Sequence, residues 1–139
     1  MKVQDCIFFQ LTKASQTGSG FWAKKVEHLG VTASQAMVLN FLGEEDRVPS
    51  HILCRKLQIT SATMTGILDR LEKSALIERQ RHPEDRRAIL VCLTTKGLDH
   101  AREINDIMVE ANKEFLSQLG SKQSQNLRAL LKHVWMERS

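Results

Sequence analysis

Several patterns that mark common protein classes are missing from these 139 residues. No apolar run approaches the roughly 18 residues of a membrane span, and the opening MKVQDCIFF has too short an apolar block for a signal peptide, with an aspartate before it. The three cysteines, Cys6, Cys54 and Cys92, are far apart and show no C-x-x-C spacing. This usage argues for reduced thiols and against a structural zinc site. We therefore expect a cytoplasmic protein without a membrane partner.

The signatures of enzymes are missing as well. The chain has no glycine-rich phosphate loop, no nucleophile elbow, and no pair of carboxylates with a partner histidine at a telling spacing. A metal site needs clustered histidine, cysteine and carboxylate ligands. The candidates, His28, His100 and Glu103, could meet only if a dimer brought them together. We therefore predict no enzymatic activity, no metal and no cofactor.

The composition fits one small globular domain with a basic surface. A hydrophobic content of 42% and a charged content of 26% allow an ordinary core. The 20 basic residues exceed the 16 acidic ones, for a net charge of +4. This excess favours a polyanionic partner, although many basic proteins bind no nucleic acid. The motifs must therefore decide the partner.

The chain is organised around the stretch from Thr60 to Gly97. Its first part places apolar residues at the i, i+3, i+4 and i+7 positions of one helix face, namely Met64, Ile67, Leu68 and Leu71. The opposite face consists of small residues: Ser61, Ala62, Thr63, Thr65 and Gly66. A helix with one apolar face and one small, nearly uncharged face can approach another surface very closely.

A hairpin is predicted after this helix. The apolar strands Ala75–Arg81 and Arg87–Leu93 are joined by His82–Arg86, which contains a proline and an aspartate, both turn formers. Arg86 and Arg87 therefore lie at the tip. A helix followed by a hairpin with arginines at its tip is the layout of a winged helix-turn-helix.

Two more helices are predicted before this stretch. Thr32–Gln35 has the T-x-x-Q form of a capping box and begins a helix that reaches about Leu42, where Gly43 closes it. Arg47–Val48 then predicts one short strand.

The second of these helices is short and completes the helix-turn-helix. Ser50 is its predicted cap. Only Gln58 and Ile59 separate this helix from the next cap, which is Thr60 or Ser61. Two short helices joined so tightly form a helix-turn-helix.

Amphipathic helices flank this module. Apolar residues recur at helical spacing from Val3 to Leu29, and Gly30 ends the helix. Gly18 and Gly20 each cost roughly 1 kcal/mol relative to alanine inside a helix, so we expect a kink or break there.

After the hairpin, Thr94 or Thr95 caps a long helix that reaches Leu119, where Gly120 stops it and Ser121 restarts the chain. A final apolar stripe follows, formed by Leu127, Leu130, Leu131, Val134 and Trp135. Terminal helices of this length cannot bury their stripes against so small a module, so we expect a two-fold homodimer. The predicted fold is mainly α with a small β-hairpin wing. It is a single domain, 1–139, in which dimerisation helices (1–30 and 98–139) flank a winged helix-turn-helix module (32–97).

The chain resembles the MarR family of bacterial transcription regulators. The family's wing signature, Asp-x-Arg followed by an apolar strand and Leu-Thr-x-x-Gly, is present from Asp85 to Gly97, and Leu68–Glu72 and Leu76–Arg79 are also typical. With the flanking helices in the expected places, the resemblance covers essentially the whole chain. It implies a six-helix winged-helix homodimer that binds palindromic operator DNA, usually as a repressor relieved by a small molecule or an oxidant.

The first predicted DNA contact is the helix that begins at Ser61, which would lie in the major groove with its N-terminus toward phosphate. Ser61 and Thr63 can donate hydrogen bonds, and Ala62 and the Thr65 methyl group suit thymine methyl groups. Because this face carries no Arg, Asn or Gln, we expect much of the specificity to come from DNA shape.

The second predicted contact is the wing. Arg86 and Arg87 can enter a narrow, negative minor groove, and the family resemblance implies that Arg87 inserts while Asp85 orients it. Four further basic residues are expected to neutralise phosphates: Arg79, Arg81, Arg55 and Lys56.

The signal is open at this point. Cys6 lies roughly where the peroxide-sensing branch of the family keeps its reactive cysteine, which suggests a thiol-based sensor, but that branch holds its thiolate with tyrosines and this chain has none. A small aromatic or amphipathic effector could instead bind between the terminal helices and the winged helix. A protein-interaction module and a non-specific DNA binder are the alternatives to an operator-binding regulator. An interaction module has no need of Arg86 and Arg87 at the tip.

Overall fold

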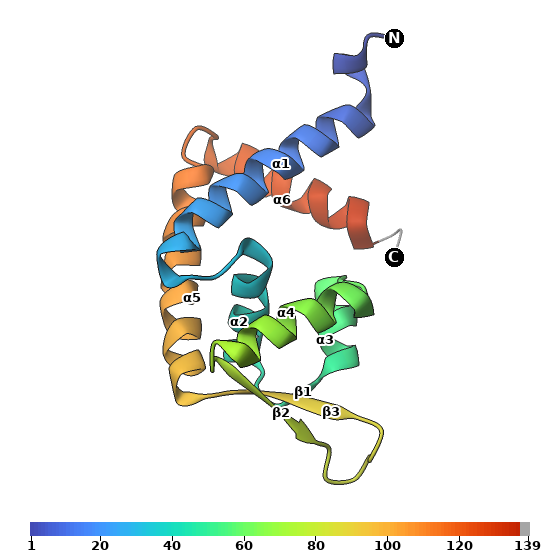
Figure 1. Ribbon diagram of the computed structural model, residues 1–139. Coiled ribbons are helices and arrows are strands. Elements are labelled where there is room, and N and C mark those ends of the chain that lie inside the picture. Colours follow the sequence, from blue (N-terminus) through green and yellow to red (C-terminus); the bar gives the residue numbers. More distant parts are fainter. Residues whose placement is uncertain (137–139) are drawn as a thin grey trace. The chain divides into compact units, whose positions relative to one another are not determined.

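The computed structural model describes residues 1–136 (Figure 1). Its elements in chain order are η1 (Val3–Asp5), α1 (Ile7–Val26), η2 (Glu27–Leu29), α2 (Ala33–Glu44), β1 (Val48–Pro49), α3 (Ser50–Leu57), α4 (Ser61–Lys73), β2 (Ile77–Arg81), β3 (Ile89–Leu93), α5 (Thr95–Phe115) and α6 (Ser121–Met136). The chain clusters into two compact units, Met1–Ile107 and Met108–Ser139, which are described separately. The predicted fold class, mainly helical with a small β wing, is confirmed.

The first helix differs from its prediction at both ends and at its middle, because α1 covers only Ile7–Val26 and 3-10 turns take up Val3–Asp5 and Glu27–Leu29. α1 is unbroken through Gly18 and Gly20, so the expected break is wrong. A Cβ at either glycine would meet no atom within 4 Å, so neither glycine is needed for close packing. The 20-residue helix forms in spite of the unfavourable helix propensity of the two glycines. Near its end, buried Trp22 donates its indole N–H to the carbonyl of Ala33 (3.2 Å). Gly30 then ends η2 with a left-handed φ of 71°, as predicted.

The capping box at the start of α2 is confirmed. Thr32 Oγ1 accepts from the Gln35 N–H (3.2 Å), and Gln35 Oε1 accepts from the Thr32 N–H (3.0 Å). The helix extends two residues beyond its predicted end because Gly43 lies inside the last turn. A Cβ on Gly43 would be 3.1 Å from the Cβ of Ala101, so this glycine permits close packing of α2 against α5.

The tight connection between α3 and α4 is as predicted, but the cap of α3 is not. Pro49 is the N-cap residue, and Ser50 is the first helical residue. Gln58 closes α3 in the left-handed region (φ 55°). Thr60 then caps α4, its Oγ1 accepting from the Thr63 N–H (3.3 Å).

The wing is the outer part of a three-stranded antiparallel sheet of order β1-β3-β2. The short strand β1 pairs with β3 through Val48 and Val91. Both hairpin strands begin two residues later than predicted. At the start of β2 this is because Ala75 takes a left-handed φ of 57° to turn the chain after α4. At the tip, the backbone N–H of His82 bonds the carbonyl of Ala88, which closes a wider loop.

The Leu-Thr-x-x-Gly motif joins the wing to α5. Thr94 is the cap, because its Oγ1 accepts from the Gly97 N–H (2.9 Å) and donates to the carbonyl of Ala75 (2.7 Å). The Thr94 N–H bonds the carbonyl of Leu76 (3.2 Å). A Cβ on Gly97 would lie 1.8 Å from that same carbonyl oxygen. Only glycine therefore fits where α5 begins.

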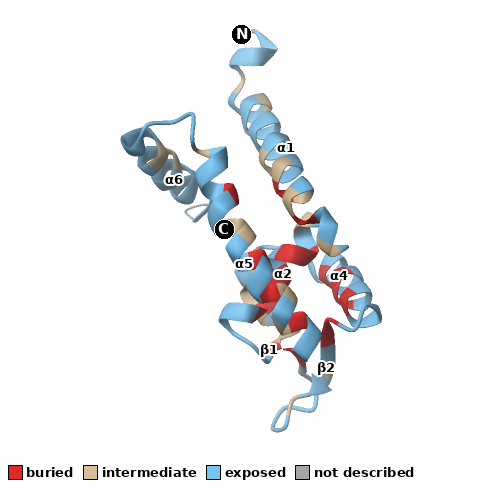
Figure 2. Ribbon diagram, turned by 90° about the vertical axis from the view of Figure 1, so that its left-hand side faces the viewer, coloured by how far each residue is buried: buried red, intermediate tan, exposed pale blue. Residues whose placement is uncertain are grey.

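The core of the first unit lies between α2, α4 and the sheet, where Figure 2 shows the buried positions gathered. The four predicted residues of the α4 stripe are all buried: Met64, Ile67, Leu68 and Leu71. Leu39 and Leu42 of α2 and Leu53 of α3 are fully buried as well. The small face of α4 is left exposed.

The second unit contains the end of α5 and α6. The long helix ends at Phe115 and not at Leu119, after which Gly120 accepts the Ser124 N–H as the chain restarts. None of the apolar stripe of α6 is buried, and the exposed fraction of Leu130 is 64%. The last three residues of the predicted dimerisation segment lie outside the described residues. Within residues 1–136, no helix is long and apolar enough to cross a membrane.

Candidate nucleic-acid interface

The N-terminus of α4 combines a fixed cap with an exposed small face. Thr60 Oγ1 accepts from the Thr63 N–H and donates to Thr63 Oγ1 (3.0 Å). Because Thr63 Oγ1 is an acceptor in that bond, its own proton is available to an outside acceptor. The Thr65 hydroxyl instead donates to the carbonyl of Ser61 (2.9 Å), which leaves its methyl group as the apolar contact.

This face can therefore come close to a second surface without meeting a long or charged side chain. Its exposed residues are Ser61, Ala62, Thr63, Thr65 and Gly66. The first turn of α4 holds no acidic residue, so nothing there opposes the approach of phosphate to the positive end of the helix.

The tip of the wing is ordered by hydrogen bonds from its own side chains. The ring Nδ1 of His82 accepts from the backbone N–H groups of Glu84 and Asp85, both at 3.1 Å. Asp85 Oδ1 accepts from the backbone N–H of Arg87 (3.0 Å). Asp85 thus orients Arg87 through its backbone. Arg86 and Arg87 are exposed, and within the described residues neither has an ion-pair partner.

Arg79, which is also predicted to contact phosphate, forms ion pairs with two carboxylates of α4. Its Nη2 lies 2.6 Å from Asp69 Oδ1 and 3.0 Å from Glu72 Oε1. Its Nε and its backbone N–H both donate to Glu72 Oε2, at 3.3 and 3.1 Å. The hydrogen bonds from Arg79 lower the pKa of Glu72, and those same bonds raise the pKa of Arg79. The charge of Arg79 is therefore already balanced within the chain.

The remaining predicted phosphate contacts are exposed. Arg81 lies two residues beyond Arg79 on β2, and Arg55 and Lys56 lie in the last turn of α3. None of the three has an ion-pair partner within the described residues. They keep a full positive charge at the surface.

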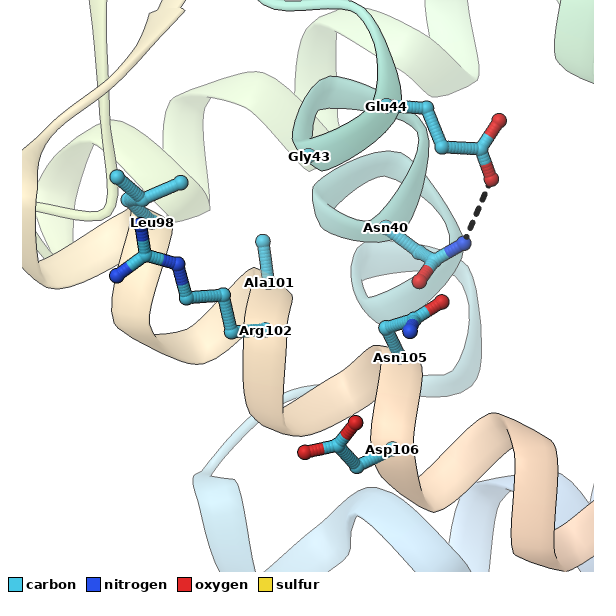
Figure 3. A pocket seen from close by; sticks show the side chains of 8 residues that line it. All are labelled: Asn40, Gly43, Glu44, Leu98, Ala101, Arg102, Asn105 and Asp106. Carbon is cyan, nitrogen blue, oxygen red and sulfur yellow. Dashed lines mark hydrogen bonds between the residues drawn. The ribbon is translucent and has the colours of Figure 1, made fainter.

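A cavity of about 620 Å³ opens between α2 and α5 (Figure 3). Its lining residues are Asn40, Gly43, Glu44, Leu98, Ala101, Arg102, Asn105 and Asp106. The Asn40 amide donates to Glu44 Oε1 (3.2 Å). Arg102 Nη1 lies 3.9 Å from Asp99. The volume is in the range of small-molecule sites, and the lining offers both apolar contact and charge.

The candidate metal ligands come together only in part. His28 Nε2 lies 3.5 Å from Glu103 Oε1, whereas His100 Nδ1 is 3.1 Å from the carbonyl of Lys96. Within residues 1–136, no group of three or more potential ligands could hold a metal ion.

The three cysteines are free thiols in different surroundings. Cys92 is buried in β3, where burial raises the pKa of its thiol. Cys54 on α3 is half-buried. Cys6 is also half-buried and immediately precedes α1.

Three further residues shape this surface without a clear signal in the sequence. Asp69 and Glu72 were part of a family motif, but their pairing with Arg79 crosses a turn and no local pattern signals it. His82 was assigned only to the turn. His82 precedes its two backbone donors, Glu84 and Asp85, by two and three residues. A histidine in this position of a hairpin turn is only a weak signal that its ring accepts such bonds.

Comparison with known proteins identifies the family. A MarR-family model matches residues 29–88. A crystal structure of a probable transcriptional regulator from Pseudomonas aeruginosa is 31% identical, with a TM-score of 0.89 over 96% of this chain and 99% of that chain. This chain belongs to the MarR family.

Two further similar proteins bear on function. The organic hydroperoxide resistance transcriptional regulator of Bacillus subtilis is 30% identical over 97 residues, which span 70% of this chain and 66% of that protein. A mutant of Escherichia coli MarR, in a crystal structure with operator DNA, is 25% identical, with a TM-score of 0.84 over 91% of each chain.

Proposed function

We propose that this chain is a DNA-binding transcriptional regulator, acting as a repressor, that binds a palindromic operator as a homodimer. The observation that carries the proposal is that the chain has two exposed surfaces, each suited to one groove of DNA. One is the small face of α4 with its capped N-terminus, and the other is a hydrogen-bonded wing tip with Arg86 and Arg87 uncompensated. The major groove accepts the first, and a narrow minor groove attracts the second. The similarity to an E. coli MarR mutant that was crystallised with operator DNA supports DNA as the partner.

The homodimer is supported by the apolar side chains that the single chain leaves uncovered. At the N-terminus the exposed fraction of Phe8 is 73% and that of Ile7 is 56%. On α6, Leu130 and Trp135 are exposed by 64% and 52%. A partner copy would cover these faces, and its two-fold symmetry would match an operator of two inverted half-sites.

Arg87→Ala tests the proposal, with Glu84→Ala as the matched change at the same exposed tip. Loss of the minor-groove contact should weaken operator binding by roughly 1–3 kcal/mol, while Glu84→Ala leaves it unchanged or slightly tighter. Binding is measured by fluorescence anisotropy at physiological salt, and folding by circular dichroism. Equal affinities of Arg87→Ala and the wild-type chain would remove the wing from the interface.

The signal that releases DNA is proposed to be a small molecule in the cavity between α2 and α5. Its volume of about 620 Å³ and its mixed lining support this. A second candidate is oxidation of Cys6, favoured by its half-buried place before α1 and by the hydroperoxide-resistance regulator among the relatives. Release by organic hydroperoxide that persists in Cys6→Ser would exclude Cys6 as the sensor.

A further inference from the structure

Arg79 connects the two elements that the proposed function places on DNA. It belongs to β2 of the wing, and its guanidinium bonds carboxylates from two successive positions of one α4 face, Asp69 and Glu72. Glu72 also accepts the backbone N–H of Arg79, so both the side chain and the main chain of this residue are fixed to the helix. A planar guanidinium that bonds several carboxylate oxygens holds a defined geometry, which a single contact between point charges does not.

The position of Arg79 along β2 determines how much of the hairpin is attached to α4. Ile77, at the start of the strand, is buried, while Glu78, Gln80 and Arg81 are exposed. Arg79 is therefore the outermost residue of β2 that the described contacts tie to α4. Beyond it the hairpin continues to the tip without a further bond to that helix within residues 1–136.

The bridge also changes the electrostatics of α4. Asp69 and Glu72 would repel phosphate if they were left unpaired on a helix that approaches DNA. The single positive charge of Arg79 compensates one of these two negative charges, and the exposed fraction of the Arg79 side chain is 29%. A guanidinium engaged in this way has few donors left for a phosphate.

We infer that Arg79 is a positioning residue, which sets the wing against α4 and thereby delivers Arg87 to the minor groove, and that it does not itself contact phosphate. The inference rests on the proposed function. Its consequence is energetic coupling: Arg79 matters to DNA binding only while Arg87 is present to use the position. A residue that contacts phosphate directly contributes whether or not Arg87 is there.

A double-mutant cycle separates these roles. Arg79→Gln should weaken operator binding about tenfold in the wild-type background, within the range expected for partial loss of one base contact. In the Arg87→Ala background the same change should have an effect of less than about twofold. The matched control is Arg81→Gln, which removes an unpaired charge from the same strand. It should weaken binding equally in both backgrounds and reduce the salt slope by roughly 0.9.

Removal of the two carboxylates should change the DNA affinity in opposite directions for a positioning residue and for a direct phosphate contact. Removing negative charge near DNA normally strengthens binding, whereas a positioning bridge predicts that Asp69→Asn with Glu72→Gln weakens it. Arg79→Gln should also speed amide hydrogen exchange in the 77–93 hairpin of the free protein, and Arg81→Gln should not. This measurement needs no DNA.

The outcomes distinguish this inference from the proposed function. Additive effects of Arg79→Gln and Arg87→Ala, or unchanged exchange in the hairpin, would overturn the positioning role and leave operator binding intact. Failure of the wild-type chain to bind any operator would overturn both. Arg79→Lys adds a check, because it keeps the charge but loses the fork and should recover only part of the affinity.

Discussion

At the scale of single residues, the join between the wing and α5 depends on backbone geometry that few side chains allow. Gly97 passes so close to the carbonyl of Leu76 that a Cβ would lie 1.8 Å from its oxygen. Ala75, on the other side of the same join, holds a left-handed φ of 57° that strains any residue with a Cβ. Both positions favour glycine, but only position 97 has one, and position 75 is occupied by alanine.

Gly97→Ala should lower the free energy of unfolding by about 3 kcal/mol, because either the start of α5 or the Leu76 peptide must move. Urea denaturation of the free protein measures this. Gly66→Ala is the control, since a Cβ there meets nothing within 4 Å, and it should stabilise α4 by up to about 1 kcal/mol. Equal stability of the Gly97→Ala and wild-type proteins would mean that this close approach is absent in solution.

Ala75→Gly should act in the opposite direction. Glycine removes the left-handed strain but makes the unfolded chain more flexible, so the net gain in unfolding free energy is about 0.5–1 kcal/mol. The same change at Ala129, inside α6, should cost about 1 kcal/mol. A loss of stability in Ala75→Gly would contradict the assigned backbone conformation.

Two helix caps were predictable because their cause is local, whereas the predicted cap at Ser50 is wrong because Pro49 takes that place. The caps at Thr32 and Thr60 accept hydrogen bonds from backbone N–H groups three positions later, so each cap and its partner lie within one short sequence motif. The ion pairs of Arg79 were not predictable, because its partners lie seven and ten positions earlier across a turn. A charge pattern alone does not reveal which arginine is already paired.

At the scale of elements, the hydrogen-bonded ion pairs of Arg79 join the hairpin to α4. The positions of helices and strands were predictable from periodicity, and the buried stripe of α4 is confirmed. The residues at which these elements begin and end were less predictable. α2 continues past Gly43 because that glycine packs against Ala101, a contact from a distant segment that overrides the usual stop signal.

The bond between Glu72 and Arg79 predicts a pH dependence of stability. Because the hydrogen bonds from Arg79 lower the folded-state pKa of Glu72 below its ordinary 4.5, the contribution is complete above that value and is lost as the pH falls through the lowered pKa. The stability difference between wild type and Glu72→Gln, measured by urea denaturation, should therefore shrink toward acid pH. Glu78→Gln, which removes a carboxylate that Arg79 does not bond, is the matched control on the same hairpin. A Glu72→Gln difference that stays constant from pH 3 to pH 7 would contradict the pairing.

At the scale of the whole molecule, the uncovered apolar residues at both ends of the chain require an explanation that one copy does not supply. We predict a dimer at micromolar concentration by analytical ultracentrifugation. Leu130→Glu should raise the dimer dissociation constant by tenfold or more, because it replaces roughly 1.5–3 kcal/mol of apolar burial with a charge. Gln125→Glu adds the same charge to the same helix and should have little effect. A monomeric wild-type chain would contradict the dimer.

Sequence patterns predicted the need for a partner copy, since the helical stripes at both ends are longer than one small module can bury. They could not identify an effector. The cavity between α2 and α5 brings Asn40 and Asp106 together from segments more than 60 residues apart, and no local motif indicates that meeting.

The proposed function requires this chain to recognise a specific operator through α4 and the wing. Selection of bound sites from a random duplex pool at physiological salt tests it most directly. We predict enrichment of an inverted repeat with half-sites about one helical turn apart, as a two-fold dimer requires. If no sequence is enriched and retention simply fades as salt rises, the proposed function is contradicted, and the winged helix is a non-specific DNA binder or a protein-interaction module.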